Sequence, residues 1–152
     1  MKKIFFLTLI PLYLFSEMVD IKADHFFADD IQKVVKFKGN AKIEQGANRF
    51  SASEILVYFN KKRKAKRYEA KGGVNFDITE SGIHYRGRAE RIVYSPNSSK
   101  YLFYGAVVLE DLTNQRKIEA ETLSLDLKTG FADIKGSRKR PVHFIFEIED
   151  RK

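Results

Sequence analysis

Apolar and polar residues alternate along most of this chain with a period of two. Between Val35 and Ile43, apolar or small residues occupy every second position, and lysines or an asparagine lie between them. The same alternation returns from Tyr68 to Ile78 and, near the C-terminus, from Val142 to Ile148. Strict alternation is typical of half-buried β-strands, whose successive side chains point to opposite faces. No segment keeps a helical spacing beyond a turn or two, so the sequence predicts an all-β protein.

Turn-forming residues separate the predicted strands at regular intervals. Asp, Asn, Ser, Gly and Pro favour tight turns because of their backbone conformations and local hydrogen bonds. The stretch from Lys61 to Arg67 could form one helical turn, but a charged loop is the simpler prediction. We expect turns at Asp29-Asp30, Gln45-Gly46, Asn60-Lys61, Ser81-Gly82, Ser95-Pro96-Asn97, Thr113-Asn114 and Lys128-Thr129-Gly130.

An internal repeat underlies the alternation. A glycine lies between apolar residues at spacings of 33, 33 and 31 residues, at Gly39, Gly72, Gly105 and Gly136. A second element, alanine followed by a polar or acidic residue, recurs at Ala23-Asp24, Ala52-Ser53, Ala89-Glu90 and Ala120-Glu121. Glycine inside a strand marks a bend or the close approach of another backbone. Two such elements per repeat predict strands stacked in successive layers.

A sheet with one apolar face and no covering helix must fold or pack on itself. Two arrangements fit the sequence: a core filled by its own side chains, or an apolar groove with room for a ligand. Small residues at inward positions such as Ala41, Ala52, Ala89 and Ala120 favour the groove. The predicted groove-lining residues are Val35, Phe37, Ile43, Val74, Phe76, Tyr94, Phe103, Val107, Leu109, Leu123 and Leu125.

Both ends of the domain are predicted to be strands with little protection at their edges. The segments from Val19 to Phe27 and from Val142 to Ile148 are largely apolar, although the basic run before Val142 could guard one edge. Unprotected edges pair readily with other strands, because their backbone groups lack partners. We expect such pairing through Ile21, Ala23, Phe144, Phe146 and Ile148.

The N-terminus has the features of a secretory signal. Lys2 and Lys3 precede an apolar run from Ile4 to Phe15, which ends at Ser16. A membrane-spanning helix needs about 20 apolar residues, so this run is short for one. We expect a signal peptide at residues 1–16, cleaved after Ser16, and a single domain at 17–152. An uncleaved N-terminal anchor is the alternative, and both predict export.

Charge and composition limit the chemistry that the domain can perform. The formal net charge is +8, and loss of the two leader lysines leaves +6. This balance favours anionic partners, and export argues against nucleic acid among them. The chain has no cysteine, and His25, His84 and His143 lack metal-ligand spacing. No catalytic motif is present either, so we expect no metal, no cofactor and no enzymatic activity.

Several segments carry a series of related motifs in chain order. They are "IKAD" (Ile21 to Asp24), "VKFKGNAKIEQG" (Val35 to Gly46), "FSASEILVY" (Phe50 to Tyr58), "GRAERIVY" (Gly87 to Tyr94) and "YLFYGAVVLED" (Tyr101 to Asp111). The series resembles the repeats of the OstA-like family of periplasmic lipopolysaccharide-transport proteins, over nearly all of the predicted mature chain. It departs at Gly105-Ala106, where the family usually has Gly-Asn, and in the strongly basic run from Lys61 to Arg67.

The resemblance implies an open, twisted β-jellyroll of stacked antiparallel strands that carries lipopolysaccharide through the periplasm without acting on it chemically. The acyl chains of the lipid A portion would lie in the groove, because each methylene removed from water contributes about 0.8 kcal/mol. The implied partners are copies of the chain itself, joined by edge-to-edge β-pairing, and the OstA domains of LptC-like inner-membrane and LptD-like outer-membrane proteins.

Two basic groups could contact the phosphates of lipid A, although solvated loops explain them as well. Their arginines are Arg63, Arg67, Arg138 and Arg140. Two other functions remain open for the chain as a whole. It could be a membrane-anchored, LptC-like subunit of the same pathway, or a structural or carbohydrate-binding module of the cell envelope whose core is full.

Overall fold

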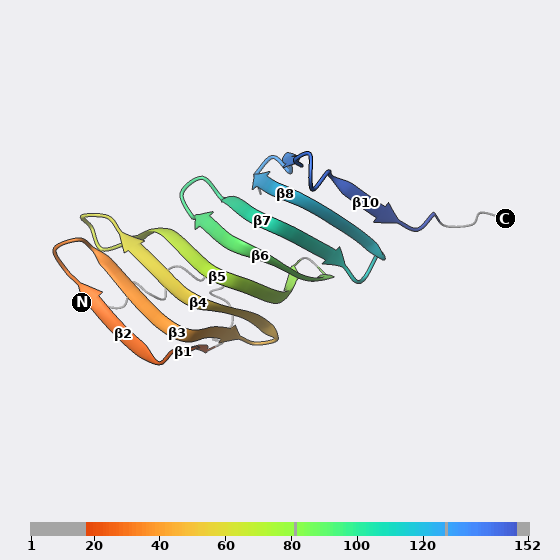
Figure 1. Ribbon diagram of the computed structural model, residues 1–152. Helices are drawn as coiled ribbons and strands as arrows, with labels where there is room; N and C mark the ends of the chain where they lie inside the picture. The colour runs from red at the N-terminus through yellow and green to blue at the C-terminus, as the bar shows by residue number, and fades with distance from the viewer. Residues whose placement is uncertain (1–17, 81, 127, 149–152) are drawn as a thin grey trace.

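The computed structural model describes residues 18–80, 82–126 and 128–148. These residues form one antiparallel sheet of ten strands (Figure 1), which confirms the predicted all-β class. Within these ranges there is no helix that could cross a membrane. The predicted signal peptide, 1–16, lies outside the described residues. The strands are β1 (Val19–Lys22), β2 (His25–Asp29), β3 (Val34–Gln45), β4 (Asn48–Phe59), β5 (Ala65–Glu80), β6 (Ile83–Ser95), β7 (Lys100–Asp111), β8 (Arg116–Asp126), β9 (Ala132–Lys135) and β10 (His143–Phe146).

Six long strands make up the body of the sheet. β3 to β8 follow one another in space as they do in sequence, and each pairs with the next. The short strands complete the two edges, since β1 and β2 each pair with one half of β3, and β10 and β9 each pair with one half of β8. The N-terminal and C-terminal strands therefore lie at opposite ends of the row (Figure 1). The sheet remains open between them.

The turns in the described ranges fall where the sequence predicts them, with Ser81 of the predicted Ser81-Gly82 turn lying outside those ranges, but the basic loop is shorter than expected. β5 begins at Ala65, so Lys66 and Arg67 belong to a strand and not to a loop. Asn60 explains the tight turn, because its side-chain oxygen accepts hydrogen bonds from the backbone N–H groups of Lys62 (2.8 Å) and Lys64 (3.1 Å).

A line of irregularities crosses the middle of the long strands, and we call it the crease. The register between neighbours shifts at this level in every pairing from β3–β4 to β7–β8. A bulge of this kind bends the strand that carries it. On alternate strands, two consecutive residues there have positive φ: Gly39 and Asn40 (88° and 46°), Gly72 and Gly73 (84° and 78°), and Gly105 and Ala106 (83° and 46°).

The two repeated sequence elements meet at the crease. Each of these glycines lies beneath the polar residue of an alanine–polar pair in the adjacent segment of the sheet, and a methyl group on the glycine would come within 2.6 Å of that side chain. The pairs are Gly39 with Asp24, Gly72 with Ser53, and Gly105 with Glu90. Two of them are also bonded: the Asn40 amide donates to Asp24 (3.0 Å), and the Ser53 hydroxyl donates to the Gly72 carbonyl (2.8 Å). The glycine and the alanine–polar pair recur together in the sequence because they contact each other in the structure.

The alanines at the crease are buried on the opposite face of the sheet. Ala41, Ala52, Ala89 and Ala120 are at most 7% exposed. The sequence suggested that these small side chains leave space for a ligand. In the structure, however, they lie at the fold line, where the two halves of the sheet converge and larger side chains would collide.

The crease folds the sheet so that its two halves face each other across an apolar interior. Phe103 on β7 pairs in register with Ile92 on β6, which in turn pairs with Ala70 on β5. Phe76 lies on β5 beyond the crease, two strands away, and two strand spacings alone amount to about 10 Å. The ring centroids of Phe76 and Phe103 are nevertheless 5.7 Å apart. We call the side of the sheet that carries these rings the inner face.

The structure corrects the predicted strand at the N-terminal edge. The expected strand from Val19 to Phe27 is broken after Lys22, because the crease continues to this edge. The Asp24 N–H donates to the carbonyl of Gly39 (2.8 Å), and β2 then pairs with the other half of β3.

At the C-terminal edge the fourth repeat differs from the other three. β9 ends at Lys135, so Gly136 does not lie within a strand as the spacing suggested. A methyl group there would come within 2.7 Å of the backbone of the Arg140–Val142 segment, so this glycine permits a close approach of two backbones. β10 ends at Phe146, and Ile148 lies beyond it.

We expect the substitution Ala106→Gly to stabilise the fold by about 0.5–1 kcal/mol, because alanine is strained at positive φ and this relief exceeds the entropy that glycine adds to the unfolded chain. Urea unfolding followed by circular dichroism would measure the change. The matched control is Ala120→Gly, at a fully buried position without positive φ. It should destabilise the protein by about 1 kcal/mol. A loss of stability in A106G would contradict the role given to the crease.

Candidate functional site

The inner face carries two continuous rows of side chains, one on each side of the crease. The first, which we call the phenylalanine row, crosses the sheet in register as Ile21, Ile43, Phe50, Phe76, Gly87, Leu109, Ile118 and Phe144. The second, the tyrosine row, crosses it as Ala28, Val35, Val57, Tyr68, Tyr94, Tyr101, Leu125 and Ala132. Both rows reach from the N-terminal edge strands to the C-terminal ones.

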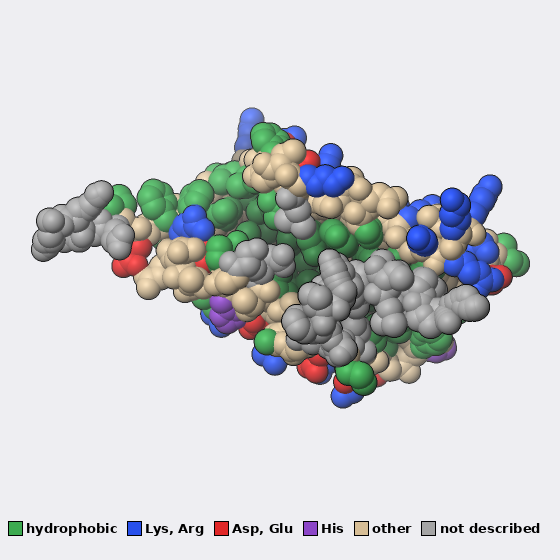
Figure 2. All heavy atoms as spheres, turned by 180° about the vertical axis from the view of Figure 1, so that it is seen from behind, with side chains coloured by type: hydrophobic (Ala, Val, Ile, Leu, Met, Phe, Trp, Pro, Cys, Tyr) green, Lys and Arg blue, Asp and Glu red, His purple; other side chains and the backbone are tan. Residues whose placement is uncertain are grey.

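All of the predicted groove residues lie on the inner face. Val74, Phe76, Phe103, Val107 and Leu123 belong to the buried cluster at its centre, at most 8% exposed. Phe37, Ile43, Leu109 and Leu125 are half-buried and pack against that cluster. Val35 and Tyr94 belong to the tyrosine row, farther from the crease. Figure 2 shows hydrophobic side chains gathered in a hollow along this side of the molecule, with Lys and Arg side chains around it.

Gly87 makes room for the ring that bridges the two halves. A methyl group at this position would lie 2.7 Å from Cζ of Phe76 and 2.2 Å from the carbonyl oxygen of Val108. The Phe76 ring therefore lies over the gap that glycine leaves in β6 and reaches Phe103. Phe50 continues the contact on the other side, with its ring centroid 6.1 Å from that of Phe76.

Three tyrosines form the middle of the tyrosine row. The centroid of Tyr94 lies 6.0 Å from that of Tyr68 and 4.4 Å from that of Tyr101, with which it stacks. Burial, with a smaller effect from Tyr94, raises the pKa of the Tyr68 hydroxyl well above its usual value, so this group stays neutral. Neutral phenols combine an apolar ring with a hydroxyl that hydrogen-bonds, which suits a boundary between apolar and polar surroundings.

The predicted edge residues lie on the outermost strands, except that Ala23 lies between β1 and β2 and Ile148 beyond β10. Large apolar side chains are exposed at both edges, with Phe26 (58%) on β2 and Phe146 (57%) on β10. Phe144 ends the phenylalanine row and is 49% exposed. Exposed aromatic residues at an open strand edge are features of a surface that binds another chain.

The structure does not bring the two predicted basic groups together. Arg63 lies in the β4–β5 turn, and the guanidinium carbon of Arg67 lies 4.1 Å from the centroid of the Tyr58 ring. Arg138 and Arg140 follow β9 at the C-terminal edge, where Arg140 forms an ion pair with Glu121 (3.0 Å). The two groups are therefore separate surfaces, and one of the four arginines already has a carboxylate partner.

A cavity of about 350 Å³ lies over β3 to β6, in the phenylalanine-row half of the sheet. Its lining includes Phe50, Phe76 and Gly87 of that row. The polar and charged residues that alternate with the row complete the lining: Lys42, Glu44, Arg49, Ser51, Asn75, Asp77 and Arg86. Among the described residues there is also no group of three or more His, Asp or Glu side chains that could hold a metal ion.

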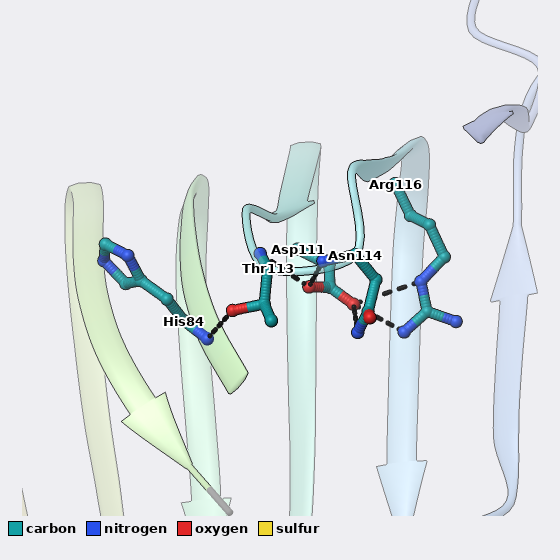
Figure 3. A network of polar contacts seen from close by, with 5 residues as sticks. All are labelled: His84, Asp111, Thr113, Asn114 and Arg116. Atoms are coloured by element: carbon teal, nitrogen blue, oxygen red, sulfur yellow. Dashed lines mark hydrogen bonds and ion pairs between the residues drawn. The ribbon is translucent and has the colours of Figure 1, made fainter. Parts of the chain in front are cut away.

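A polar network joins the turns at the end of the phenylalanine-row half of the sheet (Figure 3). Asp111 is 5% exposed and accepts hydrogen bonds from the backbone N–H groups of Thr113 (3.1 Å) and Asn114 (2.9 Å) and from the Asn114 amide (3.0 Å). Nε of Arg116 also donates to the Asp111 carboxylate (3.0 Å), and the backbone N–H of His84 donates to the Thr113 hydroxyl (2.9 Å). The network ties the β7–β8 turn to β6.

Comparison with known proteins identifies the family. A family model described as "LptA/(LptD N-terminal domain) LPS transport protein" matches residues 20–131. The chain belongs to this family of LPS transport proteins. The family is one of transport components and not of enzymes, and its match covers both rows of the inner face from β1 to β8. A search of curated proteins gave no match.

The fold of this LPS transport family member is also that of a solved relative. LptH from Pseudomonas aeruginosa, described as the LptA homologous periplasmic component of the conserved lipopolysaccharide transport device, superposes with a TM-score of 0.72. The sequences are 12% identical, and the match covers 87% of this chain and 96% of that chain. At this identity the likeness concerns the fold, and it confirms the open OstA-like β-jellyroll.

Sequence reasoning missed parts of the site that the structure places beside the predicted residues. Tyr68 and Tyr101 flank Tyr94, and Ile92 belongs to the buried cluster. Their period-two spacing from known inward positions could have identified them. Asp111 was missed as well, although an aspartate just before a Thr-Asn turn is a typical acceptor for turn N–H groups.

We expect Asp111→Asn to destabilise the protein by about 1–3 kcal/mol, because an amide cannot replace the charged acceptor of Arg116. Burial alone would raise the pKa of Asp111, but the hydrogen bonds of Asn114 and Arg116 outweigh it and lower the pKa to about 2. Because the pKa of Asp111 is lower in the folded than in the unfolded chain, the stabilisation by its carboxylate is present above about pH 4 and is lost as the pH falls towards 2.

Thermal unfolding between pH 2 and 7 would check this, with Asp133→Asn as the control at an exposed, unburied carboxylate. The stability difference between wild type and D111N should shrink below pH 4. A difference that stays constant down to pH 2 would contradict the assignment.

Proposed function

We propose that this protein carries lipopolysaccharide through the periplasm as one segment of a bridge between the inner-membrane and outer-membrane export complexes. The acyl chains would lie on the inner face between the two halves of the sheet, and the sugar would project into water. The signal peptide at 1–16 would direct the chain to the periplasm, and no chemical change to the lipid is required.

The observation that carries this proposal is the continuity of the inner face. The phenylalanine row extends in register from Ile21 on β1 to Phe144 on β10 without a charged side chain. A binding pocket for one small ligand would be closed at its ends, whereas this apolar surface reaches both open edges. Such a surface suits an acyl chain that enters at one edge and leaves at the other.

The chemistry of the cargo fits the interior. Each methylene kept from water contributes about 0.8 kcal/mol, so moving several acyl chains across an aqueous compartment requires an apolar cover. The Phe76–Phe103 contact occupies the centre of the interior, and an acyl chain there would have to push the two halves apart at this point. The folded sheet can open in this way because β3 to β8 are joined across the interior by side-chain packing and not by backbone pairing.

We expect a photoreactive residue at Phe76 or Tyr94 to capture lipopolysaccharide in cells, because both side chains lie on the inner face. Matched probes belong at Asn75 and Arg88, which are exposed on the outer face of the same two strands. Immunoblots for lipopolysaccharide on the purified adduct would show the product. Capture only at the outer positions, or at none of several inner ones, would contradict the carrier function.

We further propose that copies pair head to tail, with β10 of one copy beside β1 of the next and β9 beside β2. Both rows of the inner face would then continue from one copy to the next. The exposed aromatic side chains at the two edges support this arrangement, since pairing would cover them. The same edges would pair with OstA domains of LptC-like and LptD-like proteins.

Two variants test the direction of pairing. Removal of residues 142–152 should abolish the concentration-dependent oligomers measured by light scattering, and so should Phe26→Ser with Phe27→Ser at the other edge. A mixture of the two variants should form dimers and nothing larger, because each retains one intact and complementary edge. Oligomers of unchanged size in either variant alone would contradict head-to-tail pairing.

The family description covers both LptA and the LptD N-terminal domain, and an anchored LptC-like role also fits an uncleaved leader. Cell fractionation separates these roles, since a soluble bridge is released with the periplasm and an anchored subunit is not. Depletion of the protein should stall newly made lipopolysaccharide at the inner membrane. A structural or carbohydrate-binding module would leave that export unchanged.

A further inference from the structure

The turn between β4 and β5 holds the strongest uncompensated charge in the described part of the protein. Six of the seven residues from Lys61 to Arg67 are basic, and we call this segment, which comprises the turn and the first residues of β5, the basic turn. None of them forms an ion pair within the described residues, whereas many cations elsewhere do. In Figure 2, Lys and Arg side chains gather at the end of the molecule that carries this turn.

The basic turn is a defined structure. The Asn60 side chain accepts hydrogen bonds from two of its N–H groups, and the backbone of Asn60 is bonded to Lys64 (2.9 Å) and Arg63 (3.0 Å). Arg67 is fixed by the ring of Tyr58. The backbone that carries these positive charges is therefore ordered before any ligand arrives, which lowers the entropy lost on binding.

The basic turn directly follows the tyrosine row at one rim of the interior. Proceeding outward from the crease on this half of the sheet, the inner face carries Ile55, Ile92 and Phe103, then Tyr68 and its two partners, and then the basic turn. The order is apolar, aromatic and cationic. Tyrosines take the same place at the surface of a lipid bilayer, between hydrocarbon and charged head groups.

Among the described residues, the opposite rim has no comparable cluster of cations. At the far ends of the phenylalanine-row half, Arg86 forms an ion pair with Glu110 (3.5 Å) and Arg116 with Asp111, and the His84 ring contacts the carboxylate of Asp77 (2.7 Å). A ligand that lies between the two halves would therefore meet a cationic rim on one side and a rim without a comparable positive cluster on the other. This asymmetry can orient an amphiphile with an anionic end.

We propose that the phosphorylated sugar of the bound lipid lies over the basic turn and that the tyrosine row marks the boundary between sugar and acyl chains. This inference rests on the proposed carrier function and adds the orientation of the lipid. The phosphates are paired by Lys61, Lys62 and Lys64, and the rim formed by the β5–β6 and β7–β8 turns faces away from the sugar. The two basic groups seen in the sequence thus differ, and only the one at the basic turn binds the phosphates.

The test compares two lipids that share the same acyl chains: bisphosphorylated lipid A and lipid A from which both phosphates have been removed. Affinities for the mature protein are measured by fluorescence titration. The variant is Lys61→Gln with Lys62→Gln and Lys64→Gln. Its matched control is Lys42→Gln with Arg49→Gln and Arg88→Gln, which removes three exposed cations from the outer face.

The basic-turn variant should bind bisphosphorylated lipid A about tenfold more weakly, since three exposed ion pairs are lost. It should bind the dephosphorylated lipid like the wild type, and the control variant should differ from the wild type by less than about twofold for both lipids. Equal losses in the two variants, or an equal loss for both lipids, would overturn the proposed orientation while leaving the carrier function intact.

Two further outcomes separate the sources of phosphate and the two proposals. Inorganic phosphate should compete only far above the concentration of lipid A, and competition at equal concentration would make the turn a site for free phosphate. If the wild type binds neither lipid, the carrier function itself fails, and the orientation fails with it.

Discussion

The crease is the constraint on which the rest of this structure depends. Without it the sheet would be a flat ribbon with one exposed apolar face, and no helix is present among the described residues to cover that face. The pairs of residues with positive φ bend alternate strands, and the buried alanines let the two halves converge. The interior, the two rims and the bridging contact of Phe76 with Phe103 all follow from this bend. The positions that create the crease therefore require a particular backbone conformation or a small side chain, and not a particular chemical group.

Much of this could be predicted from the sequence because alternation reports directly which side chain faces inward. The groove residues and the turns rest on that rule and on turn chemistry, which are both local. The meeting of Gly72 with Ser53, or of Gly105 with Glu90, is a contact between strands, and spacing alone shows that both elements repeat without showing that they touch. The break between β1 and β2 was missed for the same reason, since Ala23 and Asp24 look like strand residues until Gly39 is placed beside them.

The candidate site shows a similar division. Phe76 and Phe103 were expected on one face, but their contact requires the sheet to be folded, and sequence periodicity contains no information about the fold angle. The basic turn was visible as a run of charge, yet the run ends in a strand, and only its place beside Tyr68 distinguishes it from the group at Arg138. A charge run becomes informative when the structure shows what surface it adjoins and which of its members already have partners.

The crease also determines how the number of strands in such a protein can change. Each repeat of about 33 residues supplies one hairpin and its own share of the crease, so an interior hairpin has equivalent neighbours on both sides. Duplication or deletion of one repeat would widen or narrow the sheet by two strands, about 10 Å, while leaving both terminal edges as they are. Whole repeats can therefore be gained or lost in evolution. The number of strands in one subunit would change, while the strands that form its two edges stay the same.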